Sequence, residues 1–443
     1  MATGITKQEQ FSEDVISALD FHQEPIPLPD KNEIATLTYS KKASLDEILS
    51  GITHDFREIG TSSNTVVEEI PINSFILDDN IFVLNKLIAT NTKATLFYLD
   101  PPYRTGLDFQ CRDLKHGYKD NMGQAEYLEF MRRRLILMRE CLKENGSIYV
   151  HIGHQMLAHF KVVMDEIFGA NNFRNIITRK KCSSKNFTRN QYPNLNDYIL
   201  FYTKTKSYVW NQPGVTPETK WIEKEYPKID DFGRRFKLVP VHAPGTRKGE
   251  TGKVWRGKLP PLGKHWQYTP SKLDELDREG DIYWSRNGNP RRKVYWNSEK
   301  KRPLTDYWQQ YRDAHHQSIK ITGYPTEKNF EMLKMMINAN SNPGDLVIDP
   351  FCGSGTTIHA ARELGRKYIG VDASFSAAEA TLNRMQHGIQ PMGDYVNKKE
   401  SKTAKLHSED SNYDRENCIF IVNNKLWQEY QSEIDEMRLN IGL

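Results

Sequence analysis

Residues 94–103 read Ala94-Thr95-Leu96-Phe97-Tyr98-Leu99-Asp100-Pro101-Pro102-Tyr103. The six residues before the aspartate are mostly apolar, and such a short run bounded by turn residues predicts a buried strand of a sheet. An acid, two prolines and an aromatic ring therefore follow the carboxyl end of that strand. Ligands of open α/β sheets bind at this edge. The stretch thus predicts a largely parallel sheet with a polar site where the strand ends.

The residue types after the strand suit an exocyclic amino group of a nucleobase. Such an amine shares its lone pair with the ring, so it is a poor nucleophile. Asp100 and the carbonyl of Pro101 accept its two N–H groups, and proline brings a fixed φ and no competing donor. Pro102 continues the rigid turn, and Tyr103 stacks on a base swung out of a duplex. Transfer to that amine then depends on orientation and charge placement, without a covalent intermediate.

A second strand-to-loop junction follows about 250 residues later, at residues 345–357. Its short apolar strand leads into Asp349-Pro350-Phe351-Cys352-Gly353-Ser354-Gly355-Thr356-Thr357. Glycines allow close backbone approach and positive φ, and a helix is expected from Thr356 to Leu364, with Gly365 ending it. The spacing differs from G-x-G-x-x-G, so a dinucleotide is not indicated. Asp372, at the end of the next strand, is placed to bond ribose hydroxyls.

Three motifs together resemble the amino-methylating DNA methyltransferases of bacteria and their phages. They are Asp100–Tyr103, Phe351–Gly355 and Tyr324-Pro325-Thr326-Glu327-Lys328. With the catalytic motif before the cofactor loop, residues 72–386 resemble the modification subunits of type III restriction systems and related solitary adenine methyltransferases. The resemblance implies S-adenosylmethionine as methyl donor and N6 of adenine in double-stranded DNA as acceptor, after base flipping.

The motifs and the resemblance together give a set of expected cofactor-binding residues. Asp79 follows a strand and is expected either to contact the cofactor or to cap the next helix. Lys328 is expected, by resemblance, to pair with the cofactor carboxylate, and Thr326 to bond the same group or cap a helix. The full set is Asp79, Thr326, Lys328, Asp349, Phe351, Gly353, Ser354, Gly355 and Asp372.

Other activities stay open at this point. N4 of cytosine would use the same geometry, although family habit links aspartate at the first motif position to adenine. A protein glutamine amide is a less fitting acceptor. The related family that methylates such amides has asparagine at the first position of the catalytic motif and lacks a large basic insertion. Methylation at cytosine C5 needs a cysteine nucleophile, and no Pro-Cys pair occurs. A non-catalytic DNA-recognition subunit of a restriction-modification complex is a further alternative.

Strands and helices alternate along the chain, which predicts a doubly wound, mostly parallel α/β sheet. If the glycine-loop strand is the first of the family's seven, the sheet is circularly permuted. Helices are expected at Ser44–Ile59, Ile81–Thr90, Gln124–Glu144, Gln155–Phe168, Thr326–Ala339, Thr356–Leu364 and Ser374–Gln386. The seven predicted strands are Asn73–Leu77, Thr95–Leu99, Ser147–Ile152, Arg174–Arg179, Tyr198–Tyr202, Leu346–Asp349 and Lys367–Val371.

Charge divides the chain more clearly than hydropathy. Residues 205–320 hold 24 Lys and Arg against 14 Asp and Glu, and seven of the eight tryptophans. We expect this segment to be an inserted target-recognition domain on duplex DNA, with basic clusters on phosphates and tryptophans mostly in a small core. The expected DNA-binding residues are Arg234, Arg235, Arg247, Lys248, Arg291, Arg292 and Lys293.

The predicted division has five parts. Residues 1–70 form an N-terminal appendage, 71–204 the catalytic part of the methyltransferase domain, and 205–320 the inserted domain. Residues 321–395 form the cofactor-binding part and 396–443 a C-terminal appendage.

Composition fits a protein of the reducing cytoplasm. Five cysteines form no Cys-x-x-Cys pair, which argues against a disulfide framework, and no segment is long and apolar enough to span a bilayer. His151, His154 and His159 lack metal-ligand spacing and accompanying acids, so no metal site is expected. By resemblance, a homodimer and a restriction (nuclease) subunit are candidate protein partners.

Overall fold

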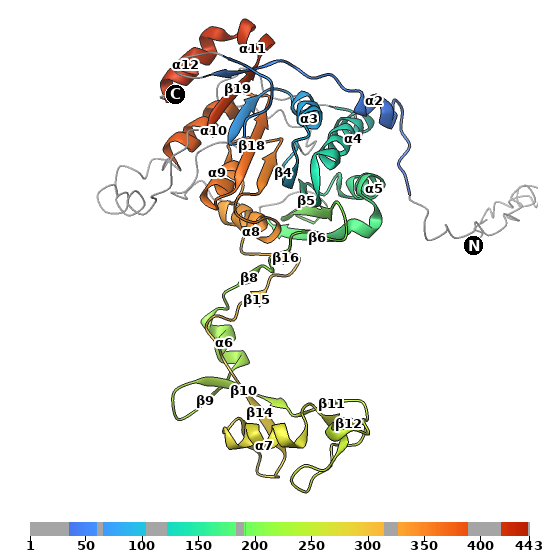
Figure 1. The fold of residues 1–443 in the computed structure, drawn as a ribbon, viewed down its shortest axis with the longest axis vertical. Helices are drawn as coiled ribbons and strands as arrows, with labels where there is room; N and C mark the ends of the chain where they lie inside the picture. The colour runs from blue at the N-terminus through green and yellow to red at the C-terminus, as the bar shows by residue number, and fades with distance from the viewer. Residues whose placement is uncertain are drawn as a thin grey trace, which may run out of the picture.

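The computed structural model describes residues 35–59, 65–102, 122–182, 190, 192–313, 327–388 and 418–441. The described chain forms an α/β body from which one arm extends (Figure 1). Tyr103 and Thr326, both expected in the site, lie outside the described residues.

An eleven-stranded mixed sheet forms the centre of the body, in the order β16-β6-β7-β5-β4-β17-β18-β3-β19-β1-β2. Strands β5, β4, β17, β18, β3 and β19 run parallel to one another, and β7 and β1 run antiparallel to their neighbours. The strands are β1 (Phe56–Ile59), β2 (Thr65–Val67), β3 (Ser74–Leu77), β4 (Ala94–Leu99), β5 (Leu142–Ile152), β6 (Phe173–Lys180), β7 (Asn196–Thr203), β16 (Tyr307–Trp308), β17 (Leu346–Asp349), β18 (Lys367–Asp372) and β19 (Ile419–Asn423).

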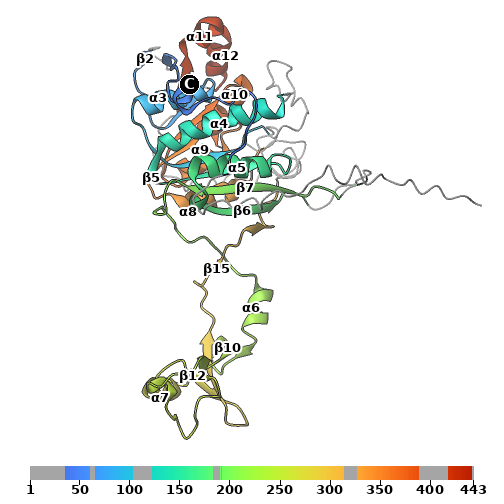
Figure 2. The same cartoon turned by 90° about the vertical axis from the view of Figure 1, so that its right-hand side faces the viewer.

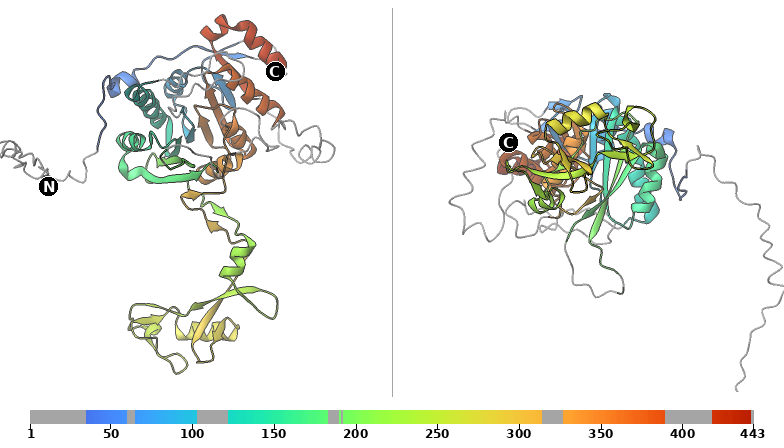
Figure 3. Two further views of the ribbon diagram at one scale, coloured as in Figure 1. Left: turned by 180° about the vertical axis from the view of Figure 1, so that it is seen from behind. Right: turned by 90° about the horizontal axis from the view of Figure 1, so that it is seen from below.

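Helices cover both faces of this sheet. One face carries α3 (Asn80–Ala89), α4 (Gln124–Cys141) and α5 (Leu157–Phe168); the other carries α8 (Phe330–Asn340), α9 (Thr356–Glu363) and α10 (Phe375–His387). The view from behind in Figure 3 separates the two groups. The other helices of the body are α2 (Leu45–Leu49), η1 (Ala170–Asn172), α11 (Asn424–Glu429) and α12 (Gln431–Ile441).

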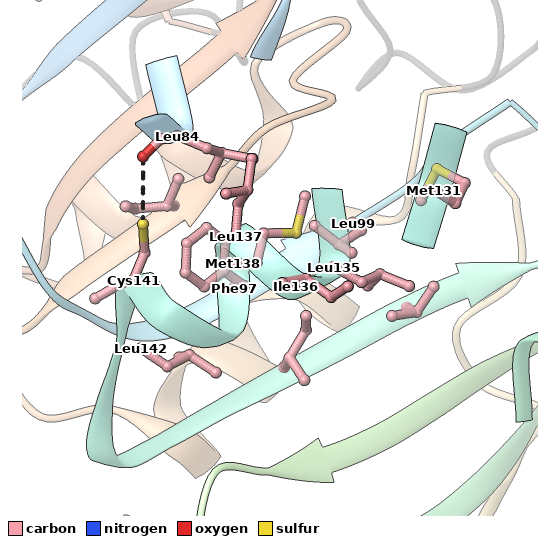
Figure 4. Close-up of a cluster of buried hydrophobic side chains, with 14 of the residues drawn as sticks. Leu84, Phe97, Leu99, Met131, Leu135, Ile136, Leu137, Met138, Cys141 and Leu142 are labelled. Atoms are coloured by element: carbon pink, nitrogen blue, oxygen red, sulfur yellow. Dashed lines mark hydrogen bonds between the residues drawn. The ribbon is translucent and has the colours of Figure 1, made fainter. Parts of the chain in front are cut away.

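Side chains that alternate along the strands build two separate cores. In β4, Phe97 and Leu99 face α3, α4 and α5, whereas Leu96 and Tyr98 face α8, α9 and α10. This is the period of two that a strand imposes. Figure 4 shows part of the first core, where the Cys141 thiol donates to the Leu84 carbonyl at 3.6 Å.

All seven predicted strands are present, and they occupy seven consecutive places in the sheet. Four further strands were not predicted: β16 at one edge and β19, β1 and β2 at the other. The two regions expected to be appendages therefore contribute strands to the central sheet. Both β1 and β19 are short and rich in residues that the fold buries, such as Phe56 and Phe420.

Two helix predictions need correction. The helix expected at Ser44–Ile59 ends at Leu49, and Phe56–Ile59 is β1, because Phe56 pairs with Asn423 of β19 in the sheet. The helix expected from Thr326 begins at Phe330, since the side chain of Asn329 accepts the N–H of Met332 at 3.0 Å and caps it.

The arm comprises residues 214–303, from β8 (Gly214–Val215) to β15 (Arg302–Pro303), which pair with each other at its base. Figure 2 shows it extending away from the sheet. Three tryptophans and Leu273 contribute to a small core of its own. Its remaining elements are α6 (Thr219–Glu225), β9 (Lys228–Ile229), β10 (Arg235–Pro240), β11 (His242–Pro244), η2 (Glu250–Gly252), β12 (Lys264–Trp266), α7 (Pro270–Arg278), β13 (Ile282–Trp284) and β14 (Pro290–Tyr295).

Candidate active site

The site lies at the carboxyl edge of four parallel strands that are neighbours in the sheet. β4, β17, β18 and β3 are adjacent and parallel, so the residues that follow them gather at one edge. Asp100 follows β4, Asp349 and Asp372 end β17 and β18, and Asp79 follows β3. Two motifs about 250 residues apart in sequence thus become neighbours because β4 pairs with β17.

Asp100 forms an ion pair with Lys328, and both side chains are mostly buried, at 18% and 11% exposure. Lys328 was expected at the cofactor carboxylate; in the structure its ammonium group lies on the acid of the first motif. A contact with cofactor stays a prediction.

The turn that carries the two prolines is held by α4 through Pro102. Pro101 is buried, and the carbonyl of Pro102 accepts the hydroxyl of Tyr127. Tyr127 is 1% exposed and stacks near Phe130. The turn after β4 is therefore tied to a long helix, and Tyr127 is a residue that the sequence analysis missed because its partner is a backbone atom.

The glycine loop between β17 and α9 is closely packed against α10. Gly355 has φ of 74°, and a Cβ there would lie 2.9 Å from side-chain atoms of Thr381. The Thr381 hydroxyl donates to the Gly353 carbonyl at 2.8 Å, and Ser354 lies 3.0 Å, oxygen to oxygen, from Thr356. The loop needs glycine at position 355 for both its backbone conformation and its lack of a side chain.

Asp372 closes the loop from the next strand. Its carboxylate accepts the N–H groups of Gly353 at 2.9 Å and Ser374 at 3.0 Å. Burial raises its pKa, against the lowering effect of these N–H donors. A carboxylate held against the loop backbone has the placement expected of a ribose-binding acid, although the contact itself stays a prediction.

Asp349 is the most perturbed acid of the site. It is 2% exposed and accepts the N–H of Phe351 at 3.0 Å. Burial raises its pKa to about 7, and the charges of Asp100 and Asp372 add to that rise. Three carboxyl groups from three strands are thus close enough to affect one another.

Asp79 caps α3 and is also bound by Arg134. Its side chain accepts the N–H of Ile81 at 3.0 Å, so Asp79 does cap the helix, and its contact with the cofactor stays a prediction. The Arg134 guanidinium donates to both oxygens of Asp79, at 2.6 and 2.9 Å, and to Asn80 at 2.6 Å. Asn80 in turn donates to the Pro350 carbonyl at 2.6 Å. Arg134 of α4, unnoticed in the sequence, thereby connects Asp79 with the glycine loop.

Phe351 and Glu327 are held from neighbouring helices. The ring of Phe351 lies 6.4 Å, centroid to centroid, from Phe130. Glu327, next to Lys328, pairs with Arg384, whose side chain is fully buried and also donates to Thr356 at the start of α9. The segment before α8 is therefore anchored to the glycine-loop helix.

A buried polar chain lies behind Asp100. Tyr98, two residues before it, has its hydroxyl 2.9 Å from Nδ1 of His151, and Nε2 of His151 lies 3.1 Å from Asp197. Arg179 donates to Asp197 at 2.9 Å. His151 was expected to be a solvated or core histidine, and it is a core residue with polar partners. Among the described residues no three His, Cys, Asp or Glu side chains gather to hold a metal ion.

The basic residues expected to bind DNA fall into different environments on the arm. Arg234 donates to Asp230 at 2.8 Å and Arg235 to Glu223 at 3.2 Å. Arg292 lies 5.3 Å from the ring centroid of Tyr268, and Lys293 lies 5.6 Å from that of Phe236.

Four of the expected DNA-binding residues are exposed: Arg234, Arg247, Lys248 and Arg291. Arg291 is near His242 and Lys264: burial first, and then the charges of Lys264 and Arg291, lower the pKa of His242. This places a group of cations on one part of the arm. Arg247 and Lys248 make no ion pair with any described residue. In the described part of the chain no helix is long and apolar enough to cross a membrane.

Comparison with known proteins gives consistent matches. A family model described as DNA methylase, N6_N4_Mtase, matches residues 94–383. The type II methyltransferase M.EcaI of Enterobacter cloacae is 54% identical over 406 residues, which cover 92% of this chain and 89% of that protein. The Mod subunit of the type III restriction-modification enzyme StyLTI of Salmonella typhimurium is 27% identical over 382 residues, covering 74% of this chain and 58% of its own.

Solved structures match more distantly. The crystal structure of an M1.HpyAVI–SAM complex is 15% identical, covers 70% of this chain and 98% of its own, and has a TM-score of 0.37.

Proposed function

The chain belongs to the DNA methylase family N6_N4_Mtase, and on that premise we propose that it is a site-specific methyltransferase that modifies N6 of adenine in duplex DNA. The methyl donor is S-adenosylmethionine. The observation that carries the proposal is the pairing of β4 with β17, which brings Asp100 to the edge that holds the glycine loop. The choice of adenine over N4 of cytosine rests on aspartate, rather than serine, at the first position of the catalytic motif.

The residues at the edge fit this cofactor. Asp372 lies against the backbone of the glycine loop, and Gly355 lets that loop adopt a left-handed φ and pack against Thr381 with no room for a side chain. S-adenosylmethionine, when bound, supplies the methyl group on a positively charged sulfur. Phe351, Gly353, Ser354 and Asp372 would hold it at the loop, with Asp79 and Lys328 as further contacts.

The chain's own residues then orient the target amine. Asp100 and the Pro101 carbonyl accept its two N–H groups, and Tyr103 stacks on the flipped base. Tyr127 holds the Pro102 carbonyl and so fixes the turn that carries both acceptors. The contribution is orientation and charge placement, with the proton leaving after the nitrogen has been methylated.

The order of the strands supports a circularly permuted methyltransferase sheet. If β17 is counted as the first strand and β18 as the second, β3, β4, β5, β6 and β7 become the third to the seventh. The spatial order is then 6-7-5-4-1-2-3, with the glycine loop after the first strand. On this view the sequence begins the sheet at its third strand, and the four other strands extend the seven.

We further propose that residues 205–320 form the target-recognition domain, inserted between residues 71–204 and 321–395 of the catalytic domain. Two antiparallel segments, β8 and β15, connect the arm to the body, and exposed cations on the arm would contact phosphates. Duplex DNA is the substrate. A homodimer and a nuclease subunit are proposed partners that follow from the resemblance to modification subunits of restriction systems.

The test is single-molecule sequencing of chromosomal DNA from a methyltransferase-free host that expresses this chain, with Asp100→Ala as the comparison. We expect N6-methyladenine at one short motif, absent in the variant, while the purified variant keeps its affinity for duplex DNA. N4-methylcytosine at one motif would correct the base and keep the site. Modification that persists undiminished in Asp100→Ala would show that the site lies elsewhere.

A further inference from the structure

A chain of four buried polar side chains connects the base of the arm to the strand that carries Asp100. These are Arg179 of β6, Asp197 of β7, His151 of β5 and Tyr98 of β4, with exposures of 0, 3, 0 and 2%. They cross four neighbouring strands of the sheet. The proposed function gives this chain no role, and two charged residues in a dry interior are costly to keep unless they are fully paired.

At the arm end, Arg179 holds the polypeptide backbone where it returns from the arm to the body. Its Nε donates to the Tyr311 carbonyl at 2.7 Å, and its second guanidinium nitrogen pairs with Asp313. The neighbouring β16 runs alongside β6, with Trp308 opposite Arg179. The segment that follows the arm is thus fixed to the sheet by the pairing of β16 with β6, by backbone hydrogen bonds such as that from the Asp313 N–H to the Lys181 carbonyl at 3.0 Å, and by the buried guanidinium group of Arg179.

At the other end, the chain reaches Asp100 by two routes. Tyr98 lies on the same face of β4 as Asp100, two residues away, and after burial itself the charge of Asp100 contributes to raising the pKa of the Tyr98 hydroxyl. Lys328, the partner of Asp100, also acts on Asp197. Burial alone would raise the pKa of Asp197, but the charges of His151, Arg179 and Lys328 outweigh it and hold that pKa well below its usual value.

Because every member is buried and in contact with the next, a displacement of Arg179 or Asp197 alone would leave a charge unpaired in the interior. Residues 311–313 contact Arg179, and Arg179 contacts Asp197, so a shift of this segment would act on the contacts that lead to Tyr98 and Asp100. Orientation at a reacting centre is sensitive: displacement by about 1 Å can cost on the order of a hundredfold in rate.

We propose that Arg179, Asp197, His151 and Tyr98 are positioning residues that couple the anchoring of the arm to the position of Asp100. When the arm is anchored to the body as in this structure, DNA bound to it would meet an Asp100 that is correctly placed to accept the amino group. A different anchoring of the arm would leave Asp100 out of place. This inference rests on the proposed role of Asp100 as that acceptor.

The first test removes the anchor far from the chemistry. Asp313→Ala breaks the outer contact of Arg179, and the half-exposed position of Asp313 makes loss of folding a minor concern. Asp306→Ala is the matched control: it removes the same charge from the same segment, and the Asp306 contact that the structure gives is a backbone one, to Thr178. The readout is transfer of labelled methyl groups from S-adenosylmethionine to chromosomal DNA of a methyltransferase-free host.

For Asp313→Ala we expect the single-turnover rate to fall by about tenfold, with the KM for cofactor and the Kd for duplex DNA within about twofold of wild type. Asp306→Ala should match wild type in all three. Equal rates for the two variants, or a loss in Asp313→Ala that is confined to DNA affinity, would overturn the inference.

The second test uses a pair of tyrosines that lie opposite each other. Tyr98→Phe removes the hydroxyl on His151, while Tyr149→Phe removes one on Asn340, and the two residues are register partners in β4 and β5. Both are buried, so a structural loss should lower the Tm of both variants alike. A lower rate in Tyr98→Phe alone would be a positioning effect. Equal rates for the two variants would contradict a positioning role of Tyr98.

The decisive measurement is the double variant Tyr98→Phe with Asp313→Ala. If both act through one chain, its rate loss should lie within about twofold of the larger single loss, because distant sites without shared partners otherwise combine independently. Losses that multiply would overturn the coupling. If wild-type protein transfers no methyl group to this DNA, the proposed function itself fails, and that result is separate from any ranking of the variants.

Discussion

At the residue scale, Gly355 shows how one missing side chain shapes the site. A Cβ there would lie 3.2 Å from Cα of Thr381 and nearer still to its side chain. We expect Gly355→Ala to displace Thr381 from the Gly353 carbonyl and to weaken cofactor affinity by roughly tenfold, measured by calorimetry with S-adenosylmethionine. Its backbone strain should cost about 1 kcal/mol in stability.

Gly344→Ala separates these two effects. Gly344 has φ of 83°, and a Cβ there would meet no atom within 4 Å. The variant should show a similar loss of stability with unchanged cofactor affinity. If both variants lose affinity equally, close packing against Thr381 is not what the loop requires.

Asp349 gives the site a predictable pH dependence. Its pKa is raised to about 7 in the folded protein by burial, so the folded state binds a proton there that the unfolded state releases above about pH 4. The destabilising effect of Asp349 therefore grows as pH rises from about 4 to 7. Asp349→Asn, which keeps an acceptor for Phe351, should stabilise the protein at pH 8 by on the order of 4 kcal/mol and have little effect at pH 4.

Asp345→Asn should change the stability at high pH in the opposite direction. Against the effect of burial, the Asn342 N–H, Thr95 and Lys143 lower the pKa of Asp345, so its stabilising effect is present above about pH 4 and lost as pH falls below that. This variant should be less stable than wild type at pH 8. Urea unfolding at pH 4 and pH 8 measures the free energy of unfolding of both variants and of wild type. A stability of Asp349→Asn that follows wild type at every pH would contradict the raised pKa.

At the element scale, α4 organises the edge of the sheet through Arg134. Its guanidinium group binds Asp79 and Asn80, donates to the Phe130 carbonyl at 2.9 Å, and lies 3.4 Å from the centroid of the Phe130 ring. A lysine cannot reproduce this planar set of donors. We expect Arg134→Lys to destabilise the protein by roughly 2 kcal/mol and to weaken cofactor binding, because Asn80 supports the Pro350 carbonyl.

Arg139→Lys is the control on the same helix. Arg139 is 40% exposed and pairs with Glu140, and exposed pairs contribute about 0–1 kcal/mol. Urea unfolding of both variants gives the comparison. Similar losses in the two would mean that Arg134 contributes no more than a surface cation.

At the scale of the whole molecule, the arm offers cations in two states. Arg247 and Lys248 are exposed and make no ion pair with the described residues, whereas Arg234 and Arg235 already pair with Asp230 and Glu223. Each phosphate contact contributes about 0.9 to the slope of log affinity against log salt. Replacing Arg247 and Lys248 together by alanine should make that slope shallower by about 2, measured by anisotropy with a labelled duplex.

The paired residues serve as the control for this prediction. Alanine at Arg234 and Arg235 should change the slope less, because their charge is already partly neutralised. A larger change at this second pair would place the DNA on the face of β10 instead of the loop before η2.

The sequence alone determined the catalytic and glycine-loop motifs, the seven strands that form the sheet around them, and the family. Each of these is local: an apolar run of four to eight residues is a strand, and an acid or glycine after it has a fixed place at the strand's end. The same local reasoning missed β1 and β19. They are two short strands near one edge of the sheet, and their pairing joins Phe56 to Asn423 across most of the chain.

Only the tertiary structure decided which charges meet. No sequence spacing reveals the ion pairs of the site, because 61 Lys and Arg and 57 Asp and Glu allow far too many combinations. These pairs are Lys328 with Asp100, Arg134 with Asp79, and Arg179 with Asp197. The pairing of strands selects among them: it brings distant residues to one edge and buries them, and a buried charge must keep the partner that geometry supplies. The sequence by itself therefore identifies the motifs, whereas the network of buried pairs that positions them is determined by the tertiary structure.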